Sequence, residues 1–406
     1  MTGHRLVIVG ASLAGVRAAE AARAEGFTGA ITLIGAESAA PYDRPPLSKA
    51  FLESPTASAP PALRSEATLR DDLGVDLRLG RAATGLDTWD KRIRLGEEEV
   101  RYDTLIIATG ARPRALPGVG GLDGAHVLRT LDDARAVRAA LDRGARTVVI
   151  GAGFIGSEVA SGARARGLTV TVVEAQPTPL VRAIGHELGQ RLAELHRANG
   201  TDLRCGTGVR SIIGYNSVDE VHLEDGSILP ADLVVVGIGA DPAVDWLAGS
   251  GLTLDDGIVC DATLWTGVDG VYAAGDVVNW HNPRFDRRMR LEHWTSATEQ
   301  AARAVRNALD PAAAQPYSTV PYFWSDWYGT RIQFVGHPDC DEVLIVDDDG
   351  DRLTALYRSG DELTGVLTLN RPGDIMKYRA LITRHASWPD ALDFAEIRRR
   401  ATAAAS

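Results

Sequence analysis

The chain of 406 residues is poor in cysteine: Cys205, Cys260 and Cys340 are far apart. This spacing argues against a disulfide framework, a cysteine-based zinc site and a CxxC redox pair. The apolar runs are strand-sized, far below the ~20 residues that cross a bilayer. No stretch has low complexity, and the N-terminus lacks a signal-peptide pattern. We therefore expect a cytoplasmic protein without a metal site or a membrane partner.

An excess of positive charge is also missing. The chain has 43 Lys and Arg against 54 Asp and Glu, a formal net charge of −11. Phosphate backbones are bound by basic surfaces, so this balance argues against nucleic acid as the main partner. With 45% hydrophobic residues, the composition is globular, and the length predicts two to three domains.

The segment VIVGASLAG predicts a strand, a turn and a helix, over Leu6–Val9 and Ala14–Glu25, followed by a strand over Ala30–Ile34. Gly10, Ser12 and Gly15 stand at the three glycine positions of G-x-G-x-x-G, which seats a dinucleotide pyrophosphate on a helix N-terminus. Serine at the second position weakens the match, so an ordinary strand–turn–helix stays an alternative. Glu37 follows the next strand, where a carboxylate binds an adenosine ribose, although a surface glutamate would read the same.

The segment VVIGAGFIGSEVA matches the same pattern in full, with Gly151, Gly153 and Gly156 between a strand and a helix. The next strand, LTVTVVE, ends at Glu174, again at ribose distance. A 2′-phosphate near this carboxylate would cost ~4 kcal/mol at an effective dielectric of about 20. After screening, we expect a preference for NADH over NADPH of about a hundredfold, although Arg182 lies close enough in sequence to modify it.

The remaining segments predict further elements. RIRL and RYDTLIIATG read as antiparallel strands, and helices are expected near Glu187–Asn199 and over His293–Leu309. IQFVG, EVLIVDD, RLTALYR and ELTGVLTL predict a separate antiparallel sheet, closed by a helix containing KYRALITR. We interpret the tail IRRRATAAAS as a fraying end.

Two dinucleotide sites in one chain indicate one pyridine nucleotide and one flavin. YDTLIIATGARPR, with Ala108, Thr109 and Gly110, and VYAAGDVV, with Gly275 and Asp276, flank the second unit. In this order the chain resembles the FAD-dependent two-dinucleotide-binding-domain flavoproteins. PYDRPPLSK, LRTLDDA, RLEHWTSATEQA and YFWSDWYG narrow the resemblance to the NADH-dependent ferredoxin reductases of oxygenase systems, over nearly the whole chain.

The resemblance implies an α/β fold with two Rossmann-like dinucleotide-binding domains, the second inserted in the first, and a C-terminal α+β domain with an antiparallel sheet. The expected boundaries are 1–114 and 245–318 for FAD, 115–244 for NAD, and 319–406 for the C-terminal domain.

Matched residue by residue, the resemblance also implies cofactor contacts. Besides the glycine turns and their carboxylates, the residues expected at FAD are Ala14, Arg44, Pro45, Lys49, Ala83, Ala108, Thr109, Gly110, Arg129, Gly275, Asp276, Glu292, His293, Trp294 and Trp324. Those expected at NADH are Phe154, Ile155, Glu158, Arg182, Ile238 and Gly239. Lys49, Glu158 and Trp324 are the candidate catalytic residues. For Trp324 a core position on an alternating strand, and for Glu158 a helix surface, remain alternatives.

Disulfide reductases of this architecture carry a cysteine pair just before a lysine like Lys49. Here the corresponding segment is PPLS, and no cysteine precedes Cys205. The resemblance therefore implies that NADH gives a hydride to flavin N5, and that two single electrons pass directly to an iron–sulfur ferredoxin feeding an oxygenase. Lys49, oriented by Glu158, would stabilise negative charge on the reduced ring.

A small acidic ferredoxin needs a positive face on an acidic reductase. HNPRFDRRMRLEHW carries Arg284, Arg287, Arg288 and Arg290, which we expect to dock it; a solvated loop is the alternative. Two other functions stay open: a rubredoxin reductase, and a flavoprotein that senses NADH and acts by binding a partner.

Overall fold

The computed structural model describes residues 3–117 and 121–403, and the chain divides into two compact units. The first unit holds three segments, which run up to Asp43, from Pro60 to Arg112 and from Ala240 to Pro321. The second unit holds Arg44–Ala59, the segment from Pro113 to Gly239, and the chain from Tyr322 onward. The two units are described in turn.

The first unit is built on a five-stranded parallel sheet with the order β19-β7-β1-β2-β3. Its strands are β1 (Arg5–Val9), β2 (Ala30–Ile34), β3 (Val75–Arg78), β7 (Thr104–Ile107) and β19 (Val271–Ala273). The prediction of an antiparallel strand in RYDTLIIATG was wrong. All four residues of β7 are buried and it lies parallel to β1, as expected for a strand covered on both faces.

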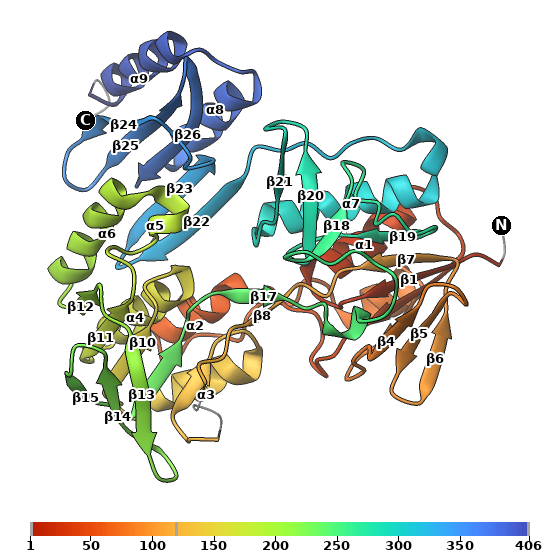
Figure 1. Ribbon diagram of the computed structural model, residues 1–406, viewed down its shortest axis with the longest axis horizontal. Coiled ribbons are helices and arrows are strands. Elements are labelled where there is room, and N and C mark those ends of the chain that lie inside the picture. Colours follow the sequence, from red (N-terminus) through yellow and green to blue (C-terminus); the bar gives the residue numbers. More distant parts are fainter. Residues whose placement is uncertain (1–2, 118–120, 404–406) are drawn as a thin grey trace. The chain divides into compact units, whose positions relative to one another are not determined.

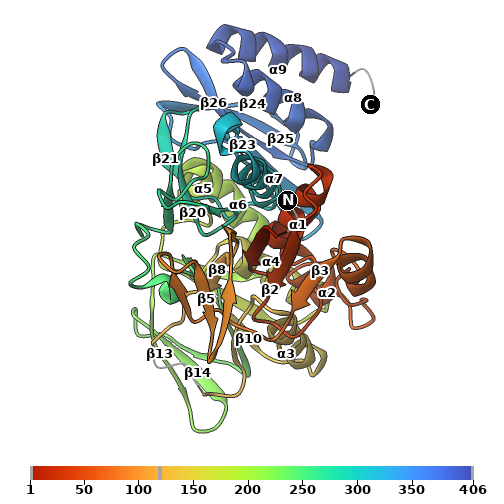
Figure 2. The same ribbon diagram turned by 90° about the vertical axis from the view of Figure 1, so that its right-hand side faces the viewer.

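Helices α1 (Leu13–Ala24) and α7 (Trp294–Leu309) lie side by side in this unit, as Figure 2 shows. Their buried faces carry small residues, including Ala18 and Ala22 on α1 and Ala301 and Ala304 on α7. Small side chains let the two helices approach closely, and α7 also contacts β19. Helix α1 begins one residue before its predicted start, and α7 begins one residue after its predicted start.

Two small sheets complete the first unit. The antiparallel sheet contains β4 (Gly85–Asp87), β5 (Arg92–Leu95) and β6 (Glu98–Arg101). The other has the order β18-β20-β21 and contains β18 (Ile258–Cys260), β20 (Val278–Asn282) and β21 (Arg287–Met289). The remaining elements are short. They are η2 (Thr68–Asp72), η3 (Asp245–Leu247), η4 (Pro311–Ala313), and the paired strands β8 (Ala111–Pro113) and β17 (Ala240–Pro242).

The second unit contains its own parallel sheet, with the order β12-β11-β10-β16-β9, of which Figure 1 labels β10, β11 and β12. Its strands are β9 (Ala125–Val127), β10 (Thr147–Ile150), β11 (Val170–Glu174), β12 (Asp202–Cys205) and β16 (Leu233–Val236). Its other elements are η1 (Pro45–Leu47), α2 (Ala50–Glu53), α3 (Leu131–Asp142), α4 (Phe154–Ala165), α5 (Val181–Ile184), α6 (His186–Ala198) and the sheet of β13 (Val209–Gly214), β14 (Val218–Leu223) and β15 (Ile228–Pro230). The predicted strand–turn–helix and the helix near 187–199 are thus present.

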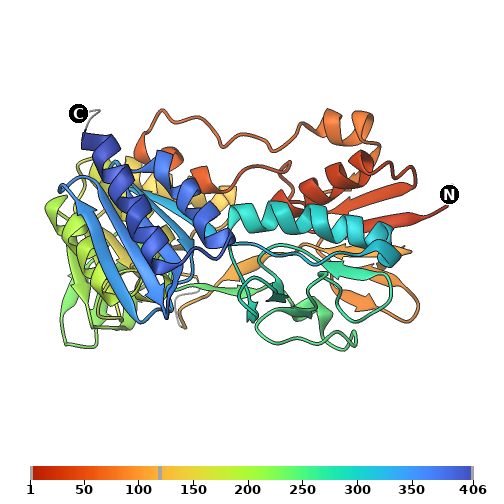
Figure 3. The same ribbon diagram turned by 90° about the horizontal axis from the view of Figure 1, so that it is seen from above.

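The C-terminal part is an antiparallel sheet, with the order β22-β23-β26-β25-β24. It contains β22 (Tyr322–Trp327), β23 (Thr330–Gly336), β24 (Glu342–Asp348), β25 (Leu353–Ser359) and β26 (Glu362–Leu369). Helices α8 (Pro372–Thr383) and α9 (Trp388–Ala403) run along it in Figure 3. Residues of α5 and α6 join Trp327 and Phe334 of this sheet in one core. The predicted fold class is confirmed.

The interpretation of the tail as a fraying end was wrong, because α9 continues to Ala403. Ala391 and Ala395 of this helix are buried, and the ring of Phe394 lies edge-on to Tyr378, with centroids 5.0 Å apart. Arg398 forms an ion pair with Asp374 at 2.6 Å. These contacts hold the helix on α8; residues 404–406 lie outside the described part.

Candidate functional site

The first glycine turn joins β1 to α1 in the first unit. Gly10 has φ +117°, and a Cβ there would lie 2.1 Å from the carbonyl oxygen of Ala108. A Cβ on Gly15 would lie 1.9 Å from the oxygen of Gly10. Both positions therefore require glycine for the fold itself, and the turn packs against the Ala108–Gly110 segment.

Ser12 occupies the position between them as the N-cap of α1, in extended conformation, and its hydroxyl does not cap the helix. In the second turn the equivalent residue is Gly153, where a Cβ would meet nothing closer than the oxygen of Gly237, 3.8 Å away. The protein has room for a small side chain at this position. The departure at Ser12 is therefore compatible with the same turn, and any demand for glycine comes from a bound group.

Glu37 lies just beyond β2, as predicted. The buried Tyr42 donates its hydroxyl proton to Glu37 Oε2 at 2.6 Å. This contact of Tyr42 was not predicted. It fixes the Glu37 carboxylate just beyond the end of β2. This hydrogen bond restricts the orientation of the Glu37 carboxylate.

The other candidates of the first unit gather around the same turn. A Cβ on Gly275, at φ +84°, would lie 3.2 Å from the Cβ of Ala14 and 3.7 Å from that of Ala297, so the Gly275-Asp276 segment meets α1 and α7. Thr109 donates to the carbonyl of Ala243 at 2.9 Å. Trp294 donates its indole N–H to Asp43 at 2.9 Å.

The start of α7 holds two further candidates. Burial lowers the pKa of His293, the N-cap of α7, to about 4, so its ring is neutral at pH 7. Glu292 is exposed and accepts from Arg290 at 2.6 Å. Ala83 is half-buried and packs against the core of the first unit.

The second glycine turn lies in the second unit. Gly151, at φ +100°, would place a Cβ 2.3 Å from the oxygen of Gly237, and Gly156 would place one 2.0 Å from the oxygen of Gly151. Glu174 follows, with Oε2 accepting from the N–H of Ala152 at 2.7 Å and Oε1 from that of Gln176 at 2.8 Å. The carboxylate is thus held against the turn by backbone donors.

The remaining nucleotide candidates surround this turn at different depths. Ile155 is 39% exposed at the start of α4, and Arg182 is exposed on α5. The ring of Phe154 packs edge-on against Phe323, with centroids 4.8 Å apart. Ile238 packs against the core under β10 and β16, and Gly239 has φ +105°.

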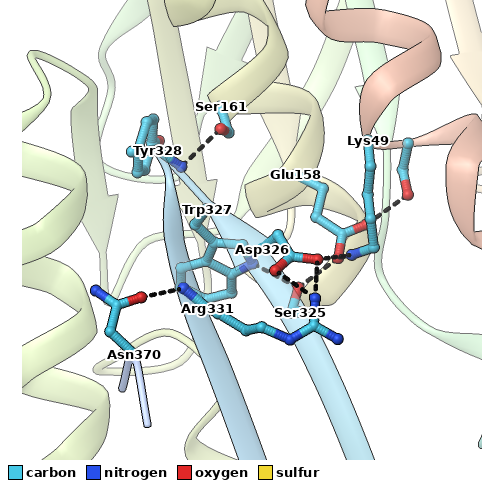
Figure 4. A network of polar contacts seen from close by, with 10 residues as sticks. Lys49, Glu158, Ser161, Ser325, Asp326, Trp327, Tyr328, Arg331 and Asn370 are labelled. Atoms are coloured by element: carbon cyan, nitrogen blue, oxygen red, sulfur yellow. Dashed lines mark hydrogen bonds and ion pairs between the residues drawn. The ribbon is translucent and has the colours of Figure 1, made fainter. Parts of the chain in front are cut away.

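Lys49 and Glu158 form an ion pair inside the second unit (Figure 4). The Glu158 side chain is 3% exposed, which overturns the alternative of a surface glutamate. Ser48 and Ser325 also donate to its carboxylate, and Asp326 Oδ2 lies 3.8 Å from Lys49 Nζ. The PPLS segment and β22 are therefore joined on α4.

Trp324 lies on the same strand, half-buried. Its ring stacks with Tyr322, centroids 5.8 Å apart, and the Arg331 guanidinium lies 5.9 Å from its centroid. Elsewhere in this unit Arg44, just before Pro45 of η1, donates to the carbonyl of Arg129 at 2.5 Å, so these two candidates are in contact.

The four arginines predicted to dock a partner differ in their surroundings. Arg287 is exposed, on β21. Arg288 donates to the carbonyls of Cys260 and Asn279, at 3.1 and 2.9 Å. Arg290 is 12% exposed and paired with Asp256 and Glu292. The half-buried Arg284 lies over the ring of Phe285, 5.2 Å from its centroid.

Across residues 3–117 and 121–403, no group of His, Cys, Asp and Glu is arranged to hold a metal ion. In the same part of the chain, each helix is too short or too polar to span a membrane.

Comparison with known proteins extends over nearly the whole chain. Residues 4–301 match the pyridine nucleotide-disulphide oxidoreductase family, and residues 322–397 match the reductase C-terminal family. The chain is 38% identical to rhodocoxin reductase of Rhodococcus erythropolis, over 93% of this chain and 89% of that protein. It is 36% identical to the ferredoxin–NAD(+) reductase component of the anthranilate 1,2-dioxygenase system of Burkholderia cepacia, over 98% of both.

Solved structures agree. The putidaredoxin reductase of a covalent complex with putidaredoxin matches with a TM-score of 0.90 at 33% identity, covering 95% of this chain and 94% of that one.

Proposed function

Because the chain belongs to the pyridine nucleotide-disulphide oxidoreductase family, we propose that it is an FAD-dependent NADH:ferredoxin oxidoreductase of an oxygenase system. One observation supports this above all: one chain contains two strand–turn–helix units, each followed by a glutamate whose carboxylate is fixed by a hydrogen bond. Several relatives are ferredoxin–NAD(+) reductase components of dioxygenase systems. The terminal oxygenase is a haem-thiolate monooxygenase or a ring-hydroxylating dioxygenase.

The residues present fit the two cofactors. Gly153, where a Cβ would meet no protein atom within 3.4 Å, leaves its turn open to a pyrophosphate. The first turns of α1 and α4 direct backbone N–H groups out of the helix ends, toward phosphate. The first unit, with Gly10, Ser12, Gly15 and Glu37, holds FAD; the second turn and Glu174 hold NADH. When bound, flavin accepts two electrons as hydride and releases them singly.

Side chains of this chain supply charge and position. Lys49 offers a positive charge to the flavin, and Glu158 orients it, which their ion pair supports. Trp324 supplies an aromatic face. The helix start at Glu292–Trp294 directs N–H groups that favour negative charge. We also propose that the chain forms three domains, with a separate C-terminal domain from residue 319. The proposed location of the protein is the cytoplasm.

Thiol chemistry has no place in the proposal. Ser48 stands before Lys49, and the first cysteine is Cys205, on β12. Burial raises the pKa of the Cys205 thiol and, more strongly, that of Cys260, so both stay protonated. No thiol of this chain would therefore relay electrons from a bound flavin.

The partner is a small acidic ferredoxin that docks near Arg284, Arg287, Arg288 and Arg290. Arg287 is the leading candidate, since it is exposed on β21 whereas the Arg290 side chain is only 12% exposed. Long-range charge would speed the encounter.

The direct test is a spectrum of the purified protein followed by titration with NADH. We expect bound FAD, bleaching of its absorbance by NADH, and rapid reduction of one member of a panel of iron–sulfur carriers. A colourless protein that does not take up FAD would overturn the proposal. Preference for rubredoxin over every ferredoxin would support the second candidate, favoured by the 35% identity to a rubredoxin–NAD(+) reductase of Pseudomonas putida. Slow turnover with all carriers would instead indicate an NADH sensor.

A further inference from the structure

The Glu158 carboxylate is held by three donors from two separate segments of the chain. Lys49 and Ser325 both bind Oε1, and Ser48 binds Oε2. The side chain is 3% exposed, so water supplies little of its solvation. A buried carboxylate depends on such donors, because burying it without them is costly. The two hydroxyls therefore matter to the geometry of the ion pair.

A second hydrogen bond determines the direction in which the Ser325 hydroxyl donates its proton. The indole N–H of Trp327 donates to Ser325 Oγ at 2.8 Å, and an indole nitrogen can only donate. The Ser325 hydroxyl accepts this hydrogen bond and turns its own proton toward Glu158. Trp327 is fully buried, with its ring centroid 5.1 Å from that of His196, and cannot easily turn away.

Lys49 also lies near a second carboxylate, that of Asp326, the residue after Ser325 on β22. Asp326 Oδ2 lies 3.8 Å from Lys49 Nζ, and Asp326 Oδ1 lies 3.2 Å from the Arg331 guanidinium (Figure 4). Asp326 is 30% exposed, so the ammonium stands between a buried carboxylate and a more solvated one. Which acceptor dominates depends on how firmly Glu158 is held.

We propose that Ser325 is a positioning residue whose hydroxyl, aimed by Trp327, holds Glu158 and thereby keeps the Lys49 ammonium on Glu158 and away from Asp326. The inference rests on the proposed function, in which Lys49 stabilises the reduced flavin. The C-terminal sheet would thus influence the midpoint potential of a bound flavin through the hydrogen bond from Ser325 to Glu158 on α4.

The test compares Ser325→Ala with Ser161→Ala. Ser161 also lies on α4 and accepts from the backbone N–H of Tyr328 at 2.8 Å, so its loss weakens the same junction without reaching Glu158. For Ser325→Ala we expect a lower flavin midpoint potential and a rate of flavin reduction by NADH reduced about tenfold, the order expected for a lost hydrogen bond to a charged group. Ser161→Ala keeps both values.

Coupling gives the second readout. In a Glu158→Gln background, Ser325→Ala should lower the rate of flavin reduction by less than about twofold and should leave the midpoint potential almost unchanged. Both substitutions act through the same carboxylate, so their effects should not add. If Ser325→Ala does not fold, Trp327→Phe removes the indole donor and should lower the potential in the same direction.

The inference is overturned if Ser325→Ala matches Ser161→Ala in potential and rate, or if its effect adds in full to that of Glu158→Gln. These outcomes presuppose a wild type that binds FAD and is reduced by NADH. A wild type that fails either step contradicts the proposed function instead.

Discussion

At the scale of single residues, the site is defined by partners that the sequence does not reveal. The glycines, the two carboxylates proposed to bind ribose, Lys49 and Glu158 follow from motifs. Ser48 and Ser325 do not, because they lie 110 and 167 positions from Glu158. Only the packing of β22 on α4 brings these side chains together. The sequence does show a serine directly before Lys49 and a Ser-Asp pair directly after Trp324. Neither pattern predicts that these serines contact Glu158.

Glu174 should determine the choice between NADH and NADPH. Its carboxylate is fixed by two backbone donors and cannot swing away from a 2′-phosphate. We expect Glu174→Gln to reduce the preference for NADH, measured as the ratio of kcat/KM values, about tenfold or more. Glu97→Gln, an exposed change of the same charge, serves as the control. An unchanged ratio would show that the Glu174 carboxylate does not determine the preference.

His196 should make the stability of the protein depend on pH. Burial lowers its pKa to about 4, whereas the unfolded value is about 6.5. The unfolded chain therefore gains a proton that the folded chain excludes, so stability is lost as pH falls from about 6.5 to about 4 and is unaffected above that window.

Between about pH 7 and pH 5, His196 should contribute a loss of ~2 kcal/mol in the free energy of unfolding. His196→Gln should remove that part of the loss in urea titrations at the two pH values. The exposed His186→Gln should retain it. Identical pH dependence in wild type and His196→Gln would contradict the prediction.

At the scale of elements, the two strand–turn–helix units follow from local chemistry and were predicted to within a residue or two. The errors came where tertiary structure decides. β7 reads like the neighbouring antiparallel strands but pairs with β1, because both its faces are buried. The end of α9 reads as a loose basic tail but is held by Arg398 and Phe394 on α8.

The second glycine turn separates what the fold needs from what the nucleotide needs. A Cβ on Gly156 would lie 2.0 Å from a backbone oxygen, while one on Gly153 meets only ordinary contacts. We expect Gly153→Ala to leave the Tm close to that of the wild type and to raise the KM for NADH about tenfold. Gly156→Ala should lower the Tm strongly even though alanine favours helices. A large drop in Tm for Gly153→Ala would show that this glycine also serves the fold.

At the scale of the whole molecule, the net charge of −11 predicted that a positive surface must be local. The sequence located the arginines but not their contacts, because the carbonyls bound by Arg288 and the Asp256 carboxylate bound by Arg290 come from other segments. Arg287 and Arg288 are both exposed, but Arg288 also holds two backbone carbonyls that its mutation would release, so Arg287 is chosen for mutation.

Arg287→Glu should raise the KM for the ferredoxin severalfold and flatten its dependence on salt, because fewer charges steer the encounter. Reduction of ferricyanide by NADH should not change. Arg101→Glu, an exposed reversal on β6 of the same unit, is the control. Equal ferredoxin kinetics in the two variants would remove Arg287 from the docking surface.

The order of strands in the first unit also bears on how the protein is made. β19 pairs with β7, and α7 packs on α1, although the whole parallel sheet of the second unit lies between them in the chain. As the polypeptide emerges from the ribosome, the nested NADH fold has all its strands by Val236, while the FAD fold still has an open edge. The parallel sheet of the first unit can therefore close only after the chain has returned from the nested sheet, and the Gly275-Asp276 segment proposed to contact flavin meets α1 only at that stage.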